Sequence, residues 1–226
     1  MKEIEPIAYF RSPFKTKFGI PRQSGLVDEL RGSIVFESKF SNEDALRGLE
    51  GFDYIWLIWG FSANELVNRT WKDGDNLTVR PPRLGGNKRV GVFASRSPFR
   101  PNGLGLSSVR IVSIGKGVIE VSGADLMDGT PIYDVKPYLP YVDAHTKVRS
   151  GFTDNNNWHP LEVDFPDNID NFFDEEEVKA LSKVLQQDPR PHYQKDANRV
   201  YGMIFANKDV RFRVENRRCI VVEIVS

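Results

Sequence analysis

The sequence predicts a mainly β N-terminal domain followed by a small α+β C-terminal domain. Before roughly residue 145, seven short apolar stretches rich in Val, Ile, Phe and Tyr recur, and Gly or Pro separates most of them. Helices of about 10–15 residues do not alternate with these stretches, as they would in a doubly wound sheet. The first domain is therefore expected to be non-Rossmann, either a β-sandwich or a β-barrel.

The predicted strands of the first domain follow one another at short intervals. They lie at residues 6–10, 32–38, 54–61, 89–95, 107–115, 117–126 and 132–139. One helix is expected among them, at residues 41–52, with Ser41 as its N-cap and Gly51 as its stop signal. The two glycines within residues 102–108 do not complete a dinucleotide-binding fingerprint.

The remainder of the chain has a different pattern. Residues 148–171 are rich in Asn and Asp and interrupted by prolines, and we expect a linker or a partly ordered crossing there. Residues 173–187 predict a helix, since acids stand at its start, lysines follow, and apolar residues form a stripe. Residues 200–226 predict a β-meander. The expected organisation is thus a first domain at 1–147, a connection at 148–171 and a C-terminal domain at 172–226.

Composition excludes several classes of protein. Lys plus Arg and Asp plus Glu number 31 each, so an RNA partner would have to recognise a local charge. The single cysteine, Cys219, rules out an intrachain disulfide and is expected to be a buried apolar residue. The three histidines lack metal-ligand spacing, so we expect no metal. Apolar runs are shorter than the ~20 residues that span a membrane, and the N-terminus lacks a signal-peptide core. A cytoplasmic protein is expected.

Three segments are candidates for chemistry. Residues 80–100 contain basic side chains and no acid, which suits phosphate contacts, although a solvated basic loop is the alternative. In residues 123–141, Asp128 and Tyr133 lie among apolar and aromatic residues that suit a polar small molecule. Asp128 could equally cap the turn that follows it. Residues 18–25 present a guanidinium and an amide after Pro21, or form an ordinary surface loop.

These segments, in this order, are similar to one family pattern. It resembles the TrmO (YaeB/VirR-like) family, the tRNA N6-threonylcarbamoyladenosine methyltransferases, over nearly the whole chain. The matching blocks are Arg11-Ser12-Pro13-Phe14, Pro21-Arg22-Gln23, residues 80–86, residues 91–97 with Arg100-Pro101-Asn102, Asp128-Gly129-Thr130-Pro131, Lys136-Pro137-Tyr138, and Asp188-Pro189-Arg190-Pro191 with Tyr193.

The resemblance implies a β-barrel methyltransferase domain, a smaller C-terminal domain and a homodimer with S-adenosyl-L-methionine near the subunit interface. It implies methylation of N6 of the threonylcarbamoyl-modified adenosine at position 37, in the anticodon arm of tRNA. The implied cofactor contacts are Pro21, Arg22, Gln23, Ser62, Ala63, Arg96, Leu106, Gly123, Ala124, Asp125 and Leu126.

Roles follow as hypotheses. Arg22 and Arg96 would bind the cofactor carboxylate or a phosphate, and Asp128 or Tyr133 would handle the proton of the substrate nitrogen. Contacts with RNA are expected from Arg80, Arg83, Lys88, Arg89, Arg100 and Arg190. Two rival functions remain at this point: a non-catalytic RNA-binding module, and a methyltransferase acting on a small molecule.

Overall fold

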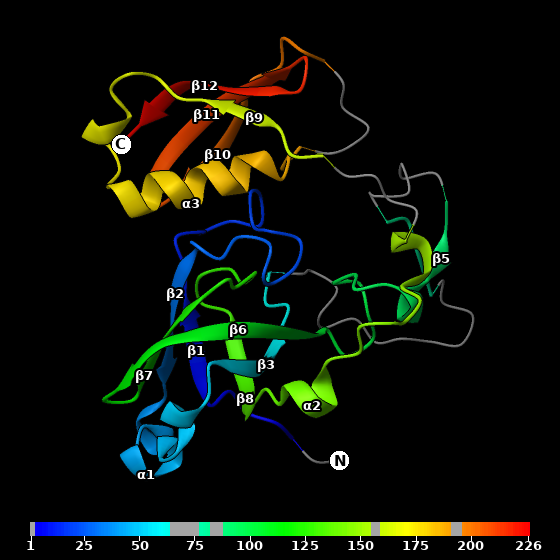
Figure 1. The fold of residues 1–226 in the computed structure, drawn as a ribbon, viewed down its shortest axis with the longest axis vertical. Coiled ribbons are helices and arrows are strands. Elements are labelled where there is room, and N and C mark those ends of the chain that lie inside the picture. Colours follow the sequence, from blue (N-terminus) through cyan, green and yellow to red (C-terminus); the bar gives the residue numbers. More distant parts are fainter. Residues whose placement is uncertain (1–2, 64–76, 82–87, 155–158, 191–195) are drawn as a thin grey trace.

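The computed structural model describes residues 3–63, 77–81, 88–154, 159–190 and 196–226. They form a β-barrel and a second, smaller unit of one helix and one sheet (Figure 1). This confirms the predicted fold class and decides between the sandwich and the barrel.

Six strands close the barrel in the order β1-β2-β7-β6-β3-β8, and each pairs with its neighbours in antiparallel fashion. The strands are β1 (Ala8–Arg11), β2 (Arg31–Phe36), β3 (Tyr54–Gly60), β6 (Leu104–Gly115), β7 (Val118–Ser122) and β8 (Pro131–Pro137). The short helix α2 (Pro140–Asp143) follows β8.

Alternation along the strands separates the barrel interior from its outer wall. On β3, Ile55, Leu57 and Trp59 are buried, whereas Tyr54 is exposed and Trp56 is partly so. The interior is filled by apolar side chains from all six strands and from the segment after β7. The barrel is therefore a packed core, and any ligand site must lie at its ends or on its wall.

Two local predictions in the barrel domain were wrong. Of residues 89–95, only β5 (Val90–Gly91) is a strand, and it pairs outside the barrel with β4 (Thr78–Val79). The following residues, Val92–Ala94, form a 3₁₀ turn because the amide and hydroxyl of Ser95 both donate to the carbonyl of Val92.

The helix expected at 41–52 is confined to α1 (Glu43–Leu46), flanked by 3₁₀ turns at Ser38–Phe40 and Leu49–Gly51. Its N-cap is Asn42, whose side chain accepts from the amide of Asp44, while the hydroxyl of Ser41 donates back to Ser38. Gly48, with φ of +88°, ends the helical stretch earlier than Gly51 would.

The C-terminal unit packs helix α3 (Glu175–Gln186) against a sheet of order β10-β11-β12-β9. Asp174 and Glu177 form a reciprocal capping box at the helix start. Strands β10 (Tyr201–Phe205), β11 (Lys208–Glu215) and β12 (Arg218–Val225) form the predicted meander.

The fourth strand of that sheet, β9 (Glu162–Asp164), lies within the segment 148–171 that we expected to be a connection. It pairs parallel to β12. Buried Leu161 just before it joins the apolar core of the C-terminal unit, which explains why this polar stretch is ordered there. Short 3₁₀ turns occur at Gly151–Thr153 and Ile169–Asn171.

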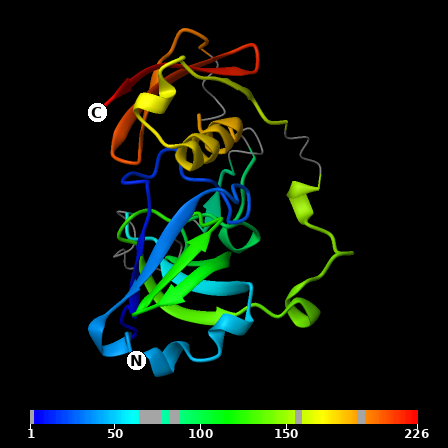
Figure 2. The same ribbon diagram turned by 60° about the vertical axis from the view of Figure 1, so that its left-hand side comes forward.

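The connection between β1 and β2 belongs to the C-terminal core. Phe14, Val27 and Leu30 are buried in one cluster with α3 and the sheet, and the ring of Phe14 lies 5.5 Å from that of Phe205. The amide of Ala206 also donates to the carbonyl of Pro13 at 3.0 Å. Figures 1 and 2 both show this blue segment between the barrel and α3. The two units therefore share an apolar core.

Cys219 is fully buried in this core, as predicted, and burial raises the pKa of its thiol to about 12. In the part of the chain that the structure describes, no three His, Cys, Asp or Glu side chains are grouped to hold a metal ion. No helix among the described residues has the length and apolar character needed to span a membrane.

Candidate active site at one end of the barrel

Most of the predicted cofactor residues lie at a single end of the barrel. Because all strand pairs of the barrel are antiparallel, the ends of β1, β3 and β7 meet the beginnings of β2, β6 and β8 at that end. The segment 21–25 precedes β2, residues 62–63 follow β3, and residues 123–126 follow β7. The fold thus brings together segments that are far apart in the sequence.

Backbone hydrogen bonds fasten the segment 21–25 to the segment 123–126. The amide of Gly25 donates to the carbonyl of Gly123 at 2.8 Å, and the amide of Gly123 donates to Leu30 at 3.0 Å. Gly123 has a φ of +77°, a left-handed conformation that glycine adopts without a steric penalty. The backbone after β7 is therefore held in place by the neighbouring segment.

Asp125 has its carboxylate turned into the protein at this end. The hydroxyl of Ser107 donates to it at 2.5 Å and itself accepts from the indole N–H of Trp59 at 2.9 Å. Burial raises the pKa of Asp125, and the hydrogen bonds from Ser107 and from the Ser24 amide, with the charge of Arg96, offset this only in part. A carboxyl group with an elevated pKa thus sits close to an arginine.

Arg96 lies near the same carboxyl group. Its guanidinium donates to the side-chain oxygen of Gln23 at 2.5 Å, and the amide nitrogen of Gln23 donates to the carbonyl of Arg22. Arg22 in turn donates to the carbonyl of Arg190 at 3.5 Å. Arg96 is therefore anchored beside Asp125 and remains exposed.

The remaining predicted cofactor residues differ in exposure. Pro21, Ala124 and Leu126 are buried and form part of the framework. Leu106 on β6 is 57% exposed, and Ser62 is also exposed. Ser62 and Ala63 directly follow Phe61, whose amide donates to Gly103 just before β6. These residues lie at the same end of the barrel as Asp125.

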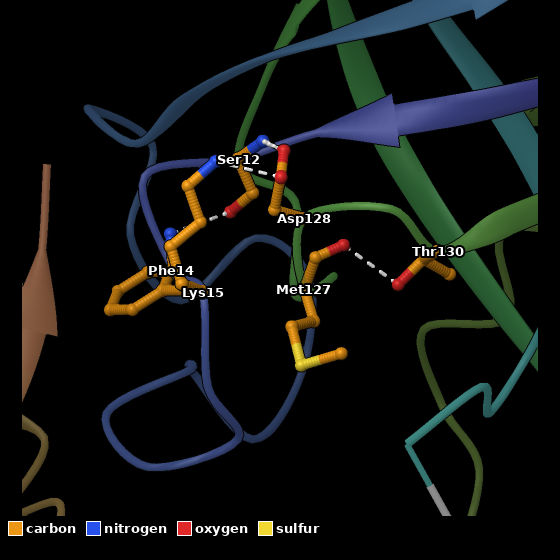
Figure 3. A network of polar contacts seen from close by, with 6 residues as sticks. All are labelled: Ser12, Phe14, Lys15, Met127, Asp128 and Thr130. Atoms are coloured by element: carbon orange, nitrogen blue, oxygen red, sulfur yellow. Dashed lines mark hydrogen bonds and ion pairs between the residues drawn. The ribbon is translucent and has the colours of Figure 1, made fainter. Parts of the chain in front are cut away.

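Asp128 binds the segment that follows β1 (Figure 3). Its carboxylate accepts from the Lys15 ammonium at 2.7 Å and from the Ser12 amide at 3.1 Å. Partial burial acts to raise the pKa of Asp128, but the hydrogen bonds from Lys15 and Ser12 outweigh it, so the pKa lies below the ordinary value. The turn after Asp128 is instead closed by Thr130, which donates to Met127. The carboxylate therefore caps the chain leaving β1 rather than its own turn.

Comparison with known proteins places this geometry in a family. The model of the tRNA-methyltransferase O N-terminal domain matches residues 9–144, and that of the TrmO C-terminal domain matches residues 159–226. The chain belongs to the TrmO family. A tRNA (adenine(37)-N6)-methyltransferase from Escherichia coli strain K12 is 35% identical, over 94% of this chain and 93% of that protein.

Two further TrmO relatives support the assignment over the full length. A putative S-adenosylmethionine-dependent methyltransferase, RcsF, from Pseudomonas aeruginosa strain PAO1 is 38% identical, over 92% of this chain and 91% of that protein. A crystal structure described as TrmO superposes with a TM-score of 0.81 at 30% identity and covers 100% of both chains. The family predicted from the sequence motifs is thereby confirmed.

The structure of this TrmO family member places the predicted RNA-contacting residues unequally. Arg80, Lys88 and Arg89 are exposed near the β4-β5 pair, and Arg83 lies outside the described residues. Arg100 donates to the carbonyls of Ser95 and Ser97 and so shapes its own loop. These predictions concern binding to RNA and stay predictions.

Arg190 is also engaged within the protein. Asp188 binds its guanidinium through two hydrogen bonds of 2.8 and 2.9 Å, and only 16% of its side chain is exposed. Tyr133, the second predicted proton-handling residue, is half-buried on β8 and packs closely over Gly60.

Sequence reasoning missed the residues that hold this TrmO site together. Ser107 lies opposite Leu57, two residues from Trp59 on the paired strand, and Ser24 reaches Asp125 from a third segment. Nothing in their spacing marks them, because strand register is a property of the folded barrel. Lys15 had a signal, since it directly follows the block Arg11–Phe14 that carries the family resemblance.

Proposed function

We propose that this chain is an S-adenosyl-L-methionine-dependent tRNA methyltransferase that acts on N6 of the adenosine at position 37. The observation that carries the proposal is the placement of exposed Arg96 near Asp125, whose carboxyl group is turned into the protein, at the barrel end of a chain that matches both TrmO domain models. The names of the relatives from E. coli and P. aeruginosa support the reaction and the methyl donor.

The residues at the barrel end fit the methyl donor by charge. Its methionine portion carries a carboxylate and an ammonium group, which complement Arg96 and Asp125. We assign the carboxylate to Arg96 and Arg22, and the polar remainder to Gln23, Asp125 and the backbone of 123–126. Leu106, Ser62 and Ala63 would complete the contacts, with Pro21, Ala124 and Leu126 as supports. Bound there, the donor supplies an electrophilic methyl group.

The protein's part in the reaction is positioning and proton handling. The lone pair of the substrate nitrogen is delocalised into the adenine ring, so orientation supplies much of the acceleration, at best on the order of 7–11 kcal/mol. A general base works best with a pKa near the working pH. The lowered pKa of Asp128 and its bond to Lys15 make it a weak base, so we propose that Asp128 positions the chain, which leaves Tyr133 as the other predicted candidate for the proton.

We propose the threonylcarbamoyl-modified adenosine as the substrate and the anticodon arm as the region bound. Exposed Arg80, Lys88 and Arg89 suit phosphate contacts; Arg83, Arg100 and Arg190 complete the predicted set. Arg190 would have to act together with Asp188, because that carboxylate already holds its guanidinium.

We also propose a homodimer located in the cytoplasm. Phe93, Phe99 and Leu106 are 73%, 47% and 57% exposed, and a partner subunit would remove this apolar surface from water. Sedimentation velocity of the full chain tests this: a single species at the monomer mass over a wide range of concentrations would contradict it.

The decisive experiment is mass spectrometry of nucleosides after incubation of the protein with tRNA and S-adenosyl-L-methionine. We expect the mass of threonylcarbamoyladenosine to increase by one methyl group. We expect no such increase with tRNA that lacks the threonylcarbamoyl group. Calorimetry with the methyl donor separates the first rival, because an RNA-binding module without a cofactor site gives no heat. A small-molecule methyltransferase would show no steep loss of tRNA affinity with salt.

A further inference from the structure

A second polar site lies on the outer wall of the barrel, beside the candidate active site. Antiparallel pairing places Arg11 of β1 opposite Ser33 of β2, and Ser33 opposite Glu120 of β7. Directly opposed residues point to the same face of a sheet, as do residues two apart on one strand, so Arg31 belongs to this face too. The alternate residues, among them Ile34, fill the barrel core.

These side chains surround an open pocket of about 340 Å³. Its lining consists of Arg11, Ser12, Pro13, Lys15, Arg31, Gly32, Ser33, Glu120 and Asp128. Three of these side chains are cations and two are carboxylates, which leaves an excess of positive charge.

Both carboxylates already have partners. Asp128 accepts from Lys15 at 2.7 Å, and Glu120 accepts from the hydroxyl of Ser33 at 2.8 Å. By contrast, the guanidinium groups of Arg11 and Arg31 make no hydrogen bond or ion pair among the residues that the structure describes. Two guanidinium groups that make no hydrogen bond among the described residues therefore line one pocket, and the charge of Arg11 also helps to lower the pKa of Asp128.

The spacing of the two arginines suits a single anionic group. Arg11 lies opposite Ser33, and Arg31 stands two residues before Ser33 on the same strand. Such diagonal neighbours are roughly 7–8 Å apart at their Cα atoms, so their long side chains can converge on one tetrahedral anion. Guanidinium groups bind phosphate oxygens in bidentate fashion.

We propose that this pocket binds one backbone phosphate of the RNA substrate. This inference rests on the proposed function, because it assumes that tRNA is the substrate. The pocket is too open to enclose a nucleotide, since sites for small ligands bury about 70–90% of the ligand surface. It suits instead a single phosphate that a larger molecule presents. Asp128 links it to the active site, because the segment 123–128 contributes to both.

The test is the salt dependence of tRNA affinity, measured by fluorescence anisotropy for the wild-type chain and for variants Arg11→Gln, Arg31→Gln and the double variant. Loss of the charged contacts should weaken binding by roughly tenfold to hundredfold at low salt. Because both arginines hold one phosphate, the slope of log affinity against log salt should fall by only about 0.7–0.9 in the double variant. A fall in the slope of twice that size would show that the two arginines bind separate phosphates, and the proposal of one shared phosphate would be overturned.

Arg47→Gln is the matched control. Arg47 directly follows α1, at the opposite end of the barrel from the pocket (Figure 1). The tRNA affinity of the Arg47→Gln variant, and the slope of that affinity against salt, should equal those of the wild type. Calorimetry should give the same affinity for S-adenosyl-L-methionine in the wild type and in all variants. If the double variant keeps the tRNA affinity and the salt slope of the wild type, the inference is overturned.

Two further outcomes separate the sources of the phosphate and the two proposals. Inorganic phosphate at constant ionic strength should compete weakly with tRNA in the wild type only. If the double variant loses binding of inorganic phosphate yet keeps full tRNA affinity, the pocket serves a free anion and the RNA assignment is overturned. If the wild type binds tRNA and the variants weaken it but no methyl group is transferred, the proposed function fails while the phosphate site stands.

Discussion

Replacement of Ser107 by alanine tests the arrangement that holds Asp125. Ser107 is 1% exposed, and its hydroxyl lies between the indole N–H of Trp59 at 2.9 Å and the Asp125 carboxylate at 2.5 Å. The substitution removes both hydrogen bonds and leaves the buried indole N–H of Trp59 and the carboxylate of Asp125 without this partner.

The magnitude follows from the two bonds. A neutral hydrogen bond contributes about 0.5–1.5 kcal/mol and one to a charged group about 1.5–3 kcal/mol. Ser107→Ala should therefore lower the free energy of unfolding by about 2–4.5 kcal/mol at a pH where Asp125 is ionised. Equilibrium unfolding in urea measures this difference, and Ser108→Ala is the control, because Ser108 makes no side-chain hydrogen bond among the described residues.

The pH dependence gives a second readout with a defined sign. The Ser107 hydrogen bond favours ionised Asp125, so its loss raises the already elevated pKa of Asp125 further. The destabilisation should be largest above both pKa values and shrink as the pH falls through the pKa in the variant and then in the wild type. A loss below about 1 kcal/mol, or one that does not change with pH, would refute the reasoning.

Three further substitutions test the shared core and the Asp128 contact. Phe14→Ala should destabilise the whole chain by about 3–5 kcal/mol, because the buried ring joins both units; Tyr141→Ala, at a residue 84% exposed, should have almost no effect in the same thermal melt. Gly19→Ala should cost much more than Gly25→Ala. Both have positive φ, but only at Gly19 would a Cβ meet the Met203 sulfur, at 1.9 Å; equal urea midpoints would contradict this. Asp128→Asn should be less stable than the wild type at neutral pH. Since the pKa of Asp128 is lowered by folding, that gap should close as the pH falls below about 3.9 and through the folded pKa; a gap that persists in acid unfolding would exclude the Lys15 pair as its cause.

Local patterns predicted the elements that depend on local chemistry. Helix α3 followed from acids at its start and from its apolar stripe, and the meander β10-β11-β12 from turns separating β-branched runs. The pattern failed at 89–95, where an apolar run forms a turn. It also failed at β9, whose pairing with β12 depends on a partner more than 50 residues away.

The candidate site was predictable in its members but not in its connections. Arg96, Gln23 and Asp125 are named by motif, and the structure brings them together. The hydroxyl of Ser107 and the partner of Asp128 depend on which strands adjoin and in which register. A single sequence does not encode that register in any visible period.

The burial of Phe14, Val27 and Leu30 beneath α3 has a consequence for how the molecule can deform. A swivel of one unit about the other would draw these rings and aliphatic groups into water, at a cost of about 1.5–3 kcal/mol for each side chain. The barrel and the C-terminal unit should therefore keep a fixed relative orientation. An RNA held by both would have to bend its own loop to the protein, and the stiffness of that loop would help decide which RNAs are accepted.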